Sequence, residues 1–297
     1  MKVLWCGELD AAELKRWQAE LSAAMPELAW AHVGDADAVA ALVANPKPGS
    51  LVGQPQLRLI QSLWAGVDRL LADPTLPAAV PLARMVDPAM NAAMAETALW
   101  ATLALHRGFF TYAQQQGQAL WRLHAQRRAD EVPVAVLGLG QMGAAVARAI
   151  ALHGYPVTGW RRQDGIDALW RLLPGSQIVI NLLPLTDNTR ALLDARFFAA
   201  LPAQASIVNL ARGAHVVDAD LLAALDRGHL QRAVLDVFHT EPLPPGHRFW
   251  THPQVTMLPH AAALTDYRSA SAVVAANLRA LRDGRPLAHL VDRDRGY

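Results

Sequence analysis

The first hundred residues alternate short apolar runs with segments of helical period. The apolar residues of 11–23 recur every three or four positions, which predicts an amphipathic helix. A long helix rich in Ala, Met and Leu is predicted to begin near Met90 and to run past Phe110. Strands are predicted at Lys2–Gly7, Ala40–Asn45 and Leu57–Leu63.

From Val132 onward the same alternation is more regular. Strands are predicted at Val132–Leu137, Pro156–Trp160, Gln177–Leu183, Ala205–Leu210, Ala233–Phe238 and Val255–Leu258, with helices at Met142–His153, Ala195–Leu201, Asp218–Arg227 and Tyr267–Leu281. Most of these strands are apolar throughout, which is typical of a parallel sheet that is buried on both faces. The β-α-β alternation therefore predicts a doubly wound α/β fold.

Composition narrows the class of protein. A chain of 297 residues has room for two domains or one large one, and 53% hydrophobic against 18% charged residues excludes intrinsic disorder. The net charge of +1 gives no reason to expect nucleic acid or an anionic membrane as a partner. The longest apolar helical stretch, near 92–105, contains Glu96 and is too short to cross a bilayer, so a cytoplasmic protein is expected.

Cysteine and histidine usage bears on metals and disulfides. The single cysteine, Cys6, lies in an apolar strand and excludes both an intrachain disulfide and a cysteine-cluster metal site. The eleven histidines are scattered without the spacing of metal ligands, so no metal site is predicted.

The strongest local pattern is a glycine-rich turn between a strand and a helix. Gly138, Gly140 and Gly143 form G-x-G-x-x-G, and Gln141 and Met142 lie inside it where the helix opens. In this context the first glycine permits the turn, the second lets the backbone approach a pyrophosphate, and the third lets the helix pack on the strand. The pattern predicts a dinucleotide site, against the alternative of a purely structural turn.

The end of the next strand indicates which dinucleotide is bound. An NAD site usually has an acidic residue here that bonds the ribose 2′-hydroxyl, whereas this strand ends in Trp160-Arg161-Arg162. Two guanidinium groups can bond a 2′-phosphate, so NADP(H) is favoured and NAD(H) stays possible. The alternative is that both arginines are solvated loop charges, partly neutralised by Asp164.

Ionisable residues follow three later strands. Arg212, Glu241 and His260 each come after the end of a predicted strand, and Asp236 lies in the last residues of the second of these strands. Open α/β sheets bind ligands at such strand ends. Each of them alone is explained as well by a surface charge or a satisfied histidine. Together, and in this order, they indicate an active site.

At this point the sequence resembles a known family. The Gly138–Gly143 loop, Asn209-x-Ala211-Arg212-Gly213, Asp236-Val237-Phe238 with Glu241-Pro242, and Pro259-His260 are similar to motifs of the D-isomer-specific 2-hydroxyacid dehydrogenases. Segments 62–68, 94–96 and 291–297 are most similar to the glyoxylate/hydroxypyruvate reductase A subgroup. The resemblance covers most of the chain.

The resemblance implies the architecture and the activity. It implies two doubly wound parallel-sheet domains with a cleft between them: a flavodoxin-like substrate-binding domain (1–98 with 268–297) and a Rossmann-like dinucleotide-binding domain (99–267). It also implies a homodimer. The implied reaction is the NADPH-dependent reduction of small 2-oxo acids such as glyoxylate and hydroxypyruvate.

The resemblance also implies roles for individual residues. Arg212 would bind the substrate carboxylate and polarise the keto oxygen, His260 would protonate that oxygen, and Glu241 would hold the imidazole and favour its protonated form. Leu183, Pro184, Leu210, Ala211 and Asp236 would line the cofactor, as would Gly138, Gly140, Gln141, Met142, Gly143, Trp160, Arg161 and Arg162. Trp64, Ala65, Gly66 and Val67 would bind the substrate together with Arg212 and His260. Trp64 departs from the small residue expected there, and it would either wall the pocket or pack between domains.

Two other functions stay open from the sequence. One is an NAD-dependent dehydrogenase of a bulkier 2-hydroxy acid. The other is a dinucleotide-sensing interaction protein without turnover, against which the complete set of Arg212, Glu241 and His260 argues.

Overall fold

The chain folds into two compact units. The computed structural model describes residues 1–31 and 35–297, of which Met1–Met90 with Thr265–Tyr297 form unit 1 and Asn91–Leu264 form unit 2. The first change of unit falls within helix α3 (Pro88–His106), between residues 90 and 91, and the second falls between 264 and 265. The sequence predicted these changes between 98 and 99 and between 267 and 268.

Unit 1 is built on a parallel sheet. Its strands are β1 (Lys2–Gly7), β2 (Ala29–Trp30), β3 (Ala40–Ala44), β4 (Leu59–Ser62) and β5 (Leu82–Ala83), in the spatial order β2-β1-β3-β4-β5. Its helices are α1 (Ala11–Ala24), α2 (Asp68–Leu71) and α9 (Tyr267–Arg282). Helix α1 begins where it does because the Asp10 carboxylate accepts hydrogen bonds from the N–H groups of Ala12 and Glu13.

The last helix packs within unit 1. The rings of Trp17 in α1 and Tyr267 in α9 meet edge to face with their centroids 5.2 Å apart. Asn277 of α9 is buried and its Nδ2 donates to Oε1 of Gln61 at 2.7 Å, which ties α9 to the central strands. Unit 1 is therefore made from both ends of the chain.

The environment of Cys6 predicts an unreactive thiol. Its side chain is buried in strand β1, and burial raises the pKa of the thiol to about 11. Because the thiolate is the nucleophile, a shift of this size leaves roughly a hundredfold less of it at a mildly alkaline pH than in an ordinary cysteine. Ellman's reagent should therefore leave the native protein unlabelled and modify one thiol after denaturation. Labelling of the native protein as fast as the unfolded chain would contradict this environment.

Unit 2 is also built on a parallel sheet, with helices on both faces. Its strands are β6 (Val134–Leu137), β7 (Val157–Trp160), β8 (Ile178–Asn181), β9 (Ala205–Asn209), β10 (Leu230–Leu235) and β11 (Val255–Met257), in the order β11-β10-β9-β8-β6-β7. Besides the greater part of α3, its helices are α4 (Phe109–Gly117), α5 (Gln141–Ala151), α6 (Ile166–Leu172), α7 (Ala195–Ala199) and α8 (Asp218–Asp226). Short 3-10 turns lie at Ala129–Glu131, Arg162–Asp164, Leu173–Gly175, Gly213–His215 and Arg248–Trp250.

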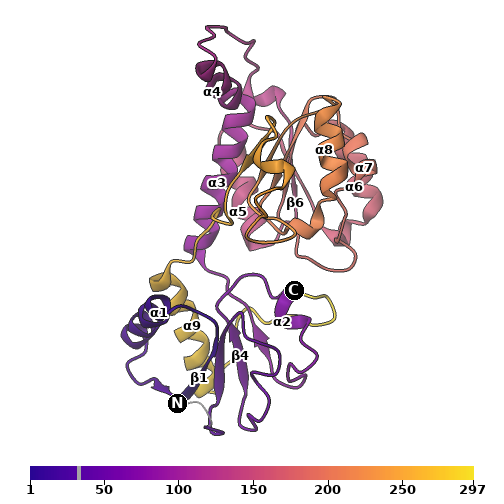
Figure 1. The fold of residues 1–297 in the computed structure, drawn as a ribbon. Coiled ribbons are helices and arrows are strands. Elements are labelled where there is room, and N and C mark those ends of the chain that lie inside the picture. The colour runs from indigo at the N-terminus through magenta and orange to yellow at the C-terminus, as the bar shows by residue number, and fades with distance from the viewer. Residues whose placement is uncertain (32–34) are drawn as a thin grey trace. The chain divides into compact units, whose positions relative to one another are not determined.

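Each face of the unit 2 sheet has its own core. Figure 1 shows α3 and α5 on one side of the sheet and α6, α7 and α8 on the other. On the first side Ala98, Val146 and Ile150 pack against the strands, and on the second side Leu169, Phe197 and Leu221 do so. Strands β6, β8 and β9 are buried along their whole length, which confirms the predicted parallel sheet with two covered faces.

The single long helix predicted from Met90 past Phe110 is wrong. Helix α3 ends at His106 and α4 begins at Phe109, because Gly108 between them adopts a positive φ of 69° that ends the first helix. Helix α6 and the two-residue strands β2 and β5 were not predicted from the sequence.

Candidate active site

One edge of the unit 2 sheet collects most of the predicted site residues. Every strand pair in this sheet is parallel, so the carboxyl ends of the strands share an edge. The loops at this edge carry the glycine turn after β6, Arg161 after β7, Arg212 after β9 and His260 after β11. The order of strands reverses between β6 and β8, and in open α/β sheets ligands bind at such a switch point.

Two of the three glycines, Gly138 and Gly143, occupy positions that a side chain could not. Gly138 has φ 94°, and a Cβ there would lie 2.7 Å from the carbonyl oxygen of Leu182. A Cβ on Gly143 would lie 1.8 Å from the carbonyl oxygen of Gly138, so helix α5 can approach the strand only because this residue is glycine. Around Gly140 there is open space on the side where a Cβ would point. The turn thus has the close packing and the open side that a bound pyrophosphate requires. We call residues 138–143 the glycine cradle.

The start of helix α5 also fits a phosphate group. Gly140 is its N-cap and makes no side-chain cap hydrogen bond, so no side chain of the cap competes for the first N–H groups of the helix at Gln141 and Met142. These donors and the positive end of the helix dipole favour an anion. The residues present therefore fit a dinucleotide.

The second strand ends in two exposed arginines. Among residues 1–31 and 35–297, neither Arg161 nor Arg162 forms an ion pair. The Asp164 carboxylate accepts a hydrogen bond from the backbone N–H of Arg161 at 2.7 Å. Trp160, by contrast, is buried, and its indole N–H donates to the carbonyl of Gly165, so the predicted cofactor contact of Trp160 has no indole donor to use.

His260 and Glu241 form a hydrogen-bonded pair. Nδ1 of His260 lies 2.8 Å from Oε2 of Glu241, while the other carboxylate oxygen, Oε1, accepts from the N–H of Phe238 at 2.9 Å. In the described part of the chain Nε2 of His260 has no hydrogen-bond partner, and the side chain is 52% exposed. The pair thus holds the imidazole by one nitrogen and leaves the other for a reactant.

Asp236 shapes the loop that carries His260. Its buried carboxylate accepts from the N–H groups of Ala261 (2.7 Å) and Ala262 (3.1 Å), and its carbonyl accepts from the N–H of His260 (2.9 Å). Burial raises the pKa of Asp236, against the backbone hydrogen bonds that lower it. His260 has φ 54°, a conformation unusual for a residue other than glycine, and the three hydrogen bonds hold it there.

Arg212 lies on a loop that touches the loop of Glu241. A Cβ on the neighbouring Gly213 would lie 1.9 Å from the carbonyl carbon of Phe238, so the two loops are in direct contact. The Arg212 side chain is partly buried, and its Nη1 donates to the carbonyl of Ala211 at 2.8 Å. Contacts within unit 2 therefore link the loops of all three predicted catalytic residues.

A buried polar network beneath this edge was missed from the sequence. Nδ2 of Asn181 lies 3.0 Å from both Oδ1 of Asn209 and Nδ1 of His215, and all three side chains are fully buried. Asn209 also donates to the carbonyl of Arg212, and Asn181 accepts from the N–H of Leu183. The network fixes both the arginine loop and the Leu183–Pro184 loop. An asparagine at the end of an apolar strand was the available signal.

The other predicted cofactor-lining residues lie at the same edge. Leu183, Leu210 and Ala211 are buried, and the carbonyl of Pro184 accepts from Oγ1 of Thr189 at 2.8 Å. Their side chains offer apolar contact only, so any contribution to cofactor binding rests on shape.

The predicted substrate loop 64–67 lies in unit 1. It joins β4 to α2, as expected, and Oγ of Ser62 accepts from the N–H of Trp64 at 3.1 Å. Nε1 of Trp64 is buried and has no hydrogen-bond partner among the described residues. Ala65 and Gly66 are partly exposed, whereas Val67 is buried.

The described part of the chain contains neither a candidate metal centre nor a helix that could span a membrane. Within 1–31 and 35–297, no group of three or more His, Cys, Asp or Glu side chains could hold a metal ion. None of the helices in the same part of the chain is both long and apolar enough to pass through a membrane.

The sheet order, the glycine cradle and the histidine–carboxylate pair define an α/β protein of the nucleotide-cofactor class. The family model described as "D-isomer specific 2-hydroxyacid dehydrogenase, NAD binding domain" matches residues 99–262. The chain belongs to the D-isomer-specific 2-hydroxyacid dehydrogenase family.

Individual relatives agree with this assignment. The glyoxylate/hydroxypyruvate reductase A of Serratia proteamaculans is 40% identical, over 95% of this chain and 96% of its own. A D-isomer-specific 2-hydroxyacid dehydrogenase of Xanthobacter autotrophicus, solved with NADPH and MES, superposes with a TM-score of 0.94 at 38% identity over 99% of this chain and 100% of its own. The NADPH-dependent glyoxylate/hydroxypyruvate reductase of Sinorhizobium meliloti, solved with NADP and sulfate, gives 0.91 at 32% identity over 100% and 99%.

Proposed function

We propose that this protein reduces small 2-oxo acids, such as glyoxylate and hydroxypyruvate, to 2-hydroxy acids with NADPH. The observation that carries the proposal is the His260–Glu241 pair at 2.8 Å, on the same sheet edge as the glycine cradle. The activities of the Serratia and Sinorhizobium relatives support the choice of substrate, and the bound NADPH and NADP of the two solved relatives support the choice of cofactor.

The reduction requires a proton for the keto oxygen of the substrate and a positive charge beside that oxygen. Arg212 binds the substrate carboxylate with a guanidinium that can make two parallel hydrogen bonds, and it polarises the keto oxygen. His260 donates the proton on Nε2 to that oxygen, and Glu241, which accepts from Nδ1, orients the imidazole for the transfer. When bound, the reduced nicotinamide supplies the hydride. The product is the 2-hydroxy acid, and His260 regains its proton from water.

Cofactor binding divides between the cradle and the arginines. Gly138, Gly140 and Gly143 let the backbone approach the pyrophosphate, and the first turn of α5 at Gln141 and Met142 supplies N–H donors. Arg161 and Arg162 bind the 2′-phosphate. In this proposal the remainder of the cofactor site is lined by Trp160, Leu183, Pro184, Leu210, Ala211 and Asp236. Asp236 therefore has two roles, because it also accepts the hydrogen bonds that fix the loop of His260.

A cofactor assay with a panel of acids tests the proposal. NADPH or NADH is mixed with glyoxylate, hydroxypyruvate or the bulkier phenylpyruvate, and loss of the reduced cofactor is followed by its near-ultraviolet absorbance. The proposal expects the largest kcat/KM with NADPH and a small acid. A preference for NADH and phenylpyruvate would favour a dehydrogenase of a bulkier acid instead. Tight NADPH binding without turnover of any acid would favour a sensor.

Three expectations from the sequence remain predictions. They are the cytoplasmic location, the homodimer, and substrate binding by Trp64, Ala65, Gly66 and Val67. Trp121 and Leu123, which follow α4, are 96% and 85% exposed, and exposed apolar side chains this close together support a protein interface. Measuring the molar mass in solution by light scattering tests the dimer.

A further inference from the structure

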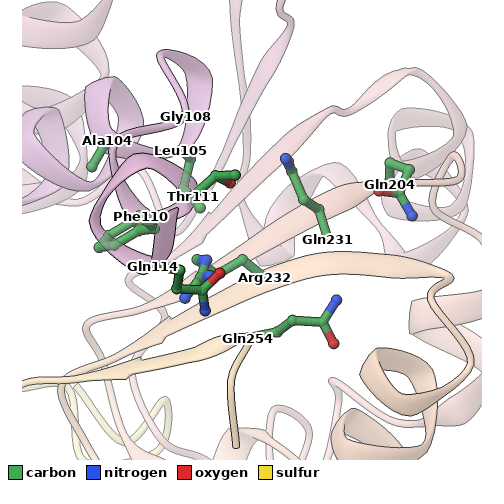
Figure 2. A pocket seen from close by; sticks show the side chains of 10 residues that line it. All are labelled: Ala104, Leu105, Gly108, Phe110, Thr111, Gln114, Gln204, Gln231, Arg232 and Gln254. Carbon is green, nitrogen blue, oxygen red and sulfur yellow. The ribbon is translucent and has the colours of Figure 1, made fainter. Parts of the chain in front are cut away.

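A cavity of about 230 Å³ lies in unit 2 and is lined by none of the residues of the proposed active site. Helices α3 and α4 and the connection between them form one wall, and the starts of three strands form the other (Figure 2). We call it the Arg232 cavity. Its lining residues are Ala104, Leu105, Gly108, Phe110, Thr111, Gln114, Gln204, Gln231, Arg232 and Gln254.

The Arg232 cavity lies at the amino-terminal edge of the sheet. Gln204 and Gln254 immediately precede β9 and β11, and Arg232 is the third residue of β10. Since these strands are parallel, their amino ends lie at the edge opposite to the loops of Arg212 and His260. The cavity and the proposed active site share no residue.

Arg232 is a buried cation without an acidic partner. The residue is 8% exposed, and in the described part of the chain no carboxylate forms an ion pair with it. Nη1 lies 3.4 Å from Oγ1 of Thr256, and the guanidinium lies 4.9 Å from the ring centre of Phe110. Burial lowers the pKa of Arg232, which is the direction expected of a cation that no anion compensates. Because arginine nevertheless stays protonated at neutral pH, the cavity contains a positive charge.

The remainder of the cavity wall offers amides and no acid. Oε1 of Gln231 accepts a long hydrogen bond from Oγ of Ser206. Within residues 1–31 and 35–297 the side-chain amide of Gln254 makes no hydrogen bond, whereas its backbone N–H donates to Nδ1 of His252. Figure 2 shows Gln231 on the same strand as Arg232 and Gln254 just before the neighbouring strand begins. No Asp or Glu lines the cavity. A ligand that matches this wall has one anionic group and at least one further hydrogen-bonding group.

We propose that the Arg232 cavity is a second ligand site, separate from the reductase site, that binds a small organic carboxylate bearing an amide or hydroxyl group. The carboxylate accepts two hydrogen bonds from the guanidinium of Arg232, and the amides of Gln231 and Gln254 pair with the second group. The ring of Phe110 lies against the guanidinium and limits its hydration.

N-acetylglycine is a suitable probe, because it carries one carboxylate and one amide and is neither a 2-oxo nor a 2-hydroxy acid. It is added to the full-length protein saturated with NADP⁺, while the Arg232 Nε–H and Gln254 side-chain amide resonances are followed by NMR. We expect saturable shifts of both resonances. N-acetylglycinamide, the uncharged counterpart, should bind about tenfold more weakly or worse, because it lacks the charge-assisted hydrogen bonds.

Variants assign the binding to the cavity. Arg232→Gln should weaken the probe about tenfold or more, and Arg232→Lys should weaken it less because the charge remains while the paired donors are lost. Arg227→Gln, an exposed arginine just after α8, should leave binding unchanged, and so should Arg212→Gln in the proposed active site. If Arg232→Gln does not fold, Arg232→Lys and Gln254→Leu provide the comparison.

Three results would overturn the second site. They are the absence of any saturable shift in the millimolar range, equal affinity in the Arg232 variants, and loss of binding in Arg212→Gln. The last would place the probe in the proposed active site. Because the readout is binding rather than turnover, failure of the reductase proposal would not by itself produce any of these results.

Discussion

Replacing His260 with Ala should lower kcat by on the order of 10²–10⁴, with little change in the affinity for NADPH. The side chain is held by Glu241 through Nδ1 and leaves Nε2 available, so its removal deletes the proposed proton donor. In the proposed site the cofactor is held by the glycine turn and the first turn of α5, and the imidazole is not among these contacts. Steady-state kinetics with glyoxylate and fluorescence titration with NADPH measure the two quantities separately.

His153→Ala is a matched control for this variant. His153 is an exposed histidine just after α5, and among residues 1–31 and 35–297 its ring bonds only the carbonyl of Ala149. It should therefore retain wild-type turnover. Near-normal turnover of His260→Ala would show that another group delivers the proton.

The double variant Arg161→Gln/Arg162→Gln should bind NADPH more weakly by on the order of ten- to a hundredfold, with NADH nearly unaffected. Both guanidiniums are exposed and without ion pairs in the described part of the chain, so they are available to a 2′-phosphate. NADH has no such phosphate and loses nothing with them. The comparison needs only the two dissociation constants, measured at one ionic strength because salt screens these contacts.

Arg171→Gln serves as the control for the cofactor variant. Arg171 is an exposed arginine in the adjacent helix α6, and its loss changes the net charge by one without touching the end of β7. It should leave both affinities unchanged. If the double variant lost affinity for NADH as much as for NADPH, the 2′-phosphate assignment would be wrong.

The regular part of the fold was predictable from local pattern. Strands β6, β8 and β9 are buried at every position because helices cover both faces of their sheet, and the mostly apolar runs that result identify them. Strands β2 and β5 are only two residues long, which is too short for any period to emerge. Helix α6 was missed for a related reason, because its seven residues span barely two turns.

The break between α3 and α4 shows a limit of composition. Ala and Leu are frequent before Gly108, aromatic residues follow it, and a lone glycine is tolerated inside many helices. What ends α3 is the backbone conformation of that glycine, which the sequence does not reveal.

Two parts of the candidate site were predicted from the sequence on different grounds. The cradle followed from physical reasoning, since three glycines between a strand and a helix have few other uses. The pairing of His260 with Glu241 came from resemblance to a family, because it depends on how two loops nineteen residues apart meet. Two features were not foreseen because they arise from tertiary contacts. One is the hydrogen bonding of Asp236 to the loop of His260, and the other is the buried network of Asn181 and His215.

Building unit 1 from both ends of the chain has a consequence for biosynthesis. Helix α9 supplies the partner of Trp17 and of Gln61, yet it is translated after all of unit 2. A ribosome-bound nascent chain therefore holds the first ninety residues with an uncovered sheet face while unit 2 emerges and folds. During that interval the apolar face that α9 later covers is open to chaperones.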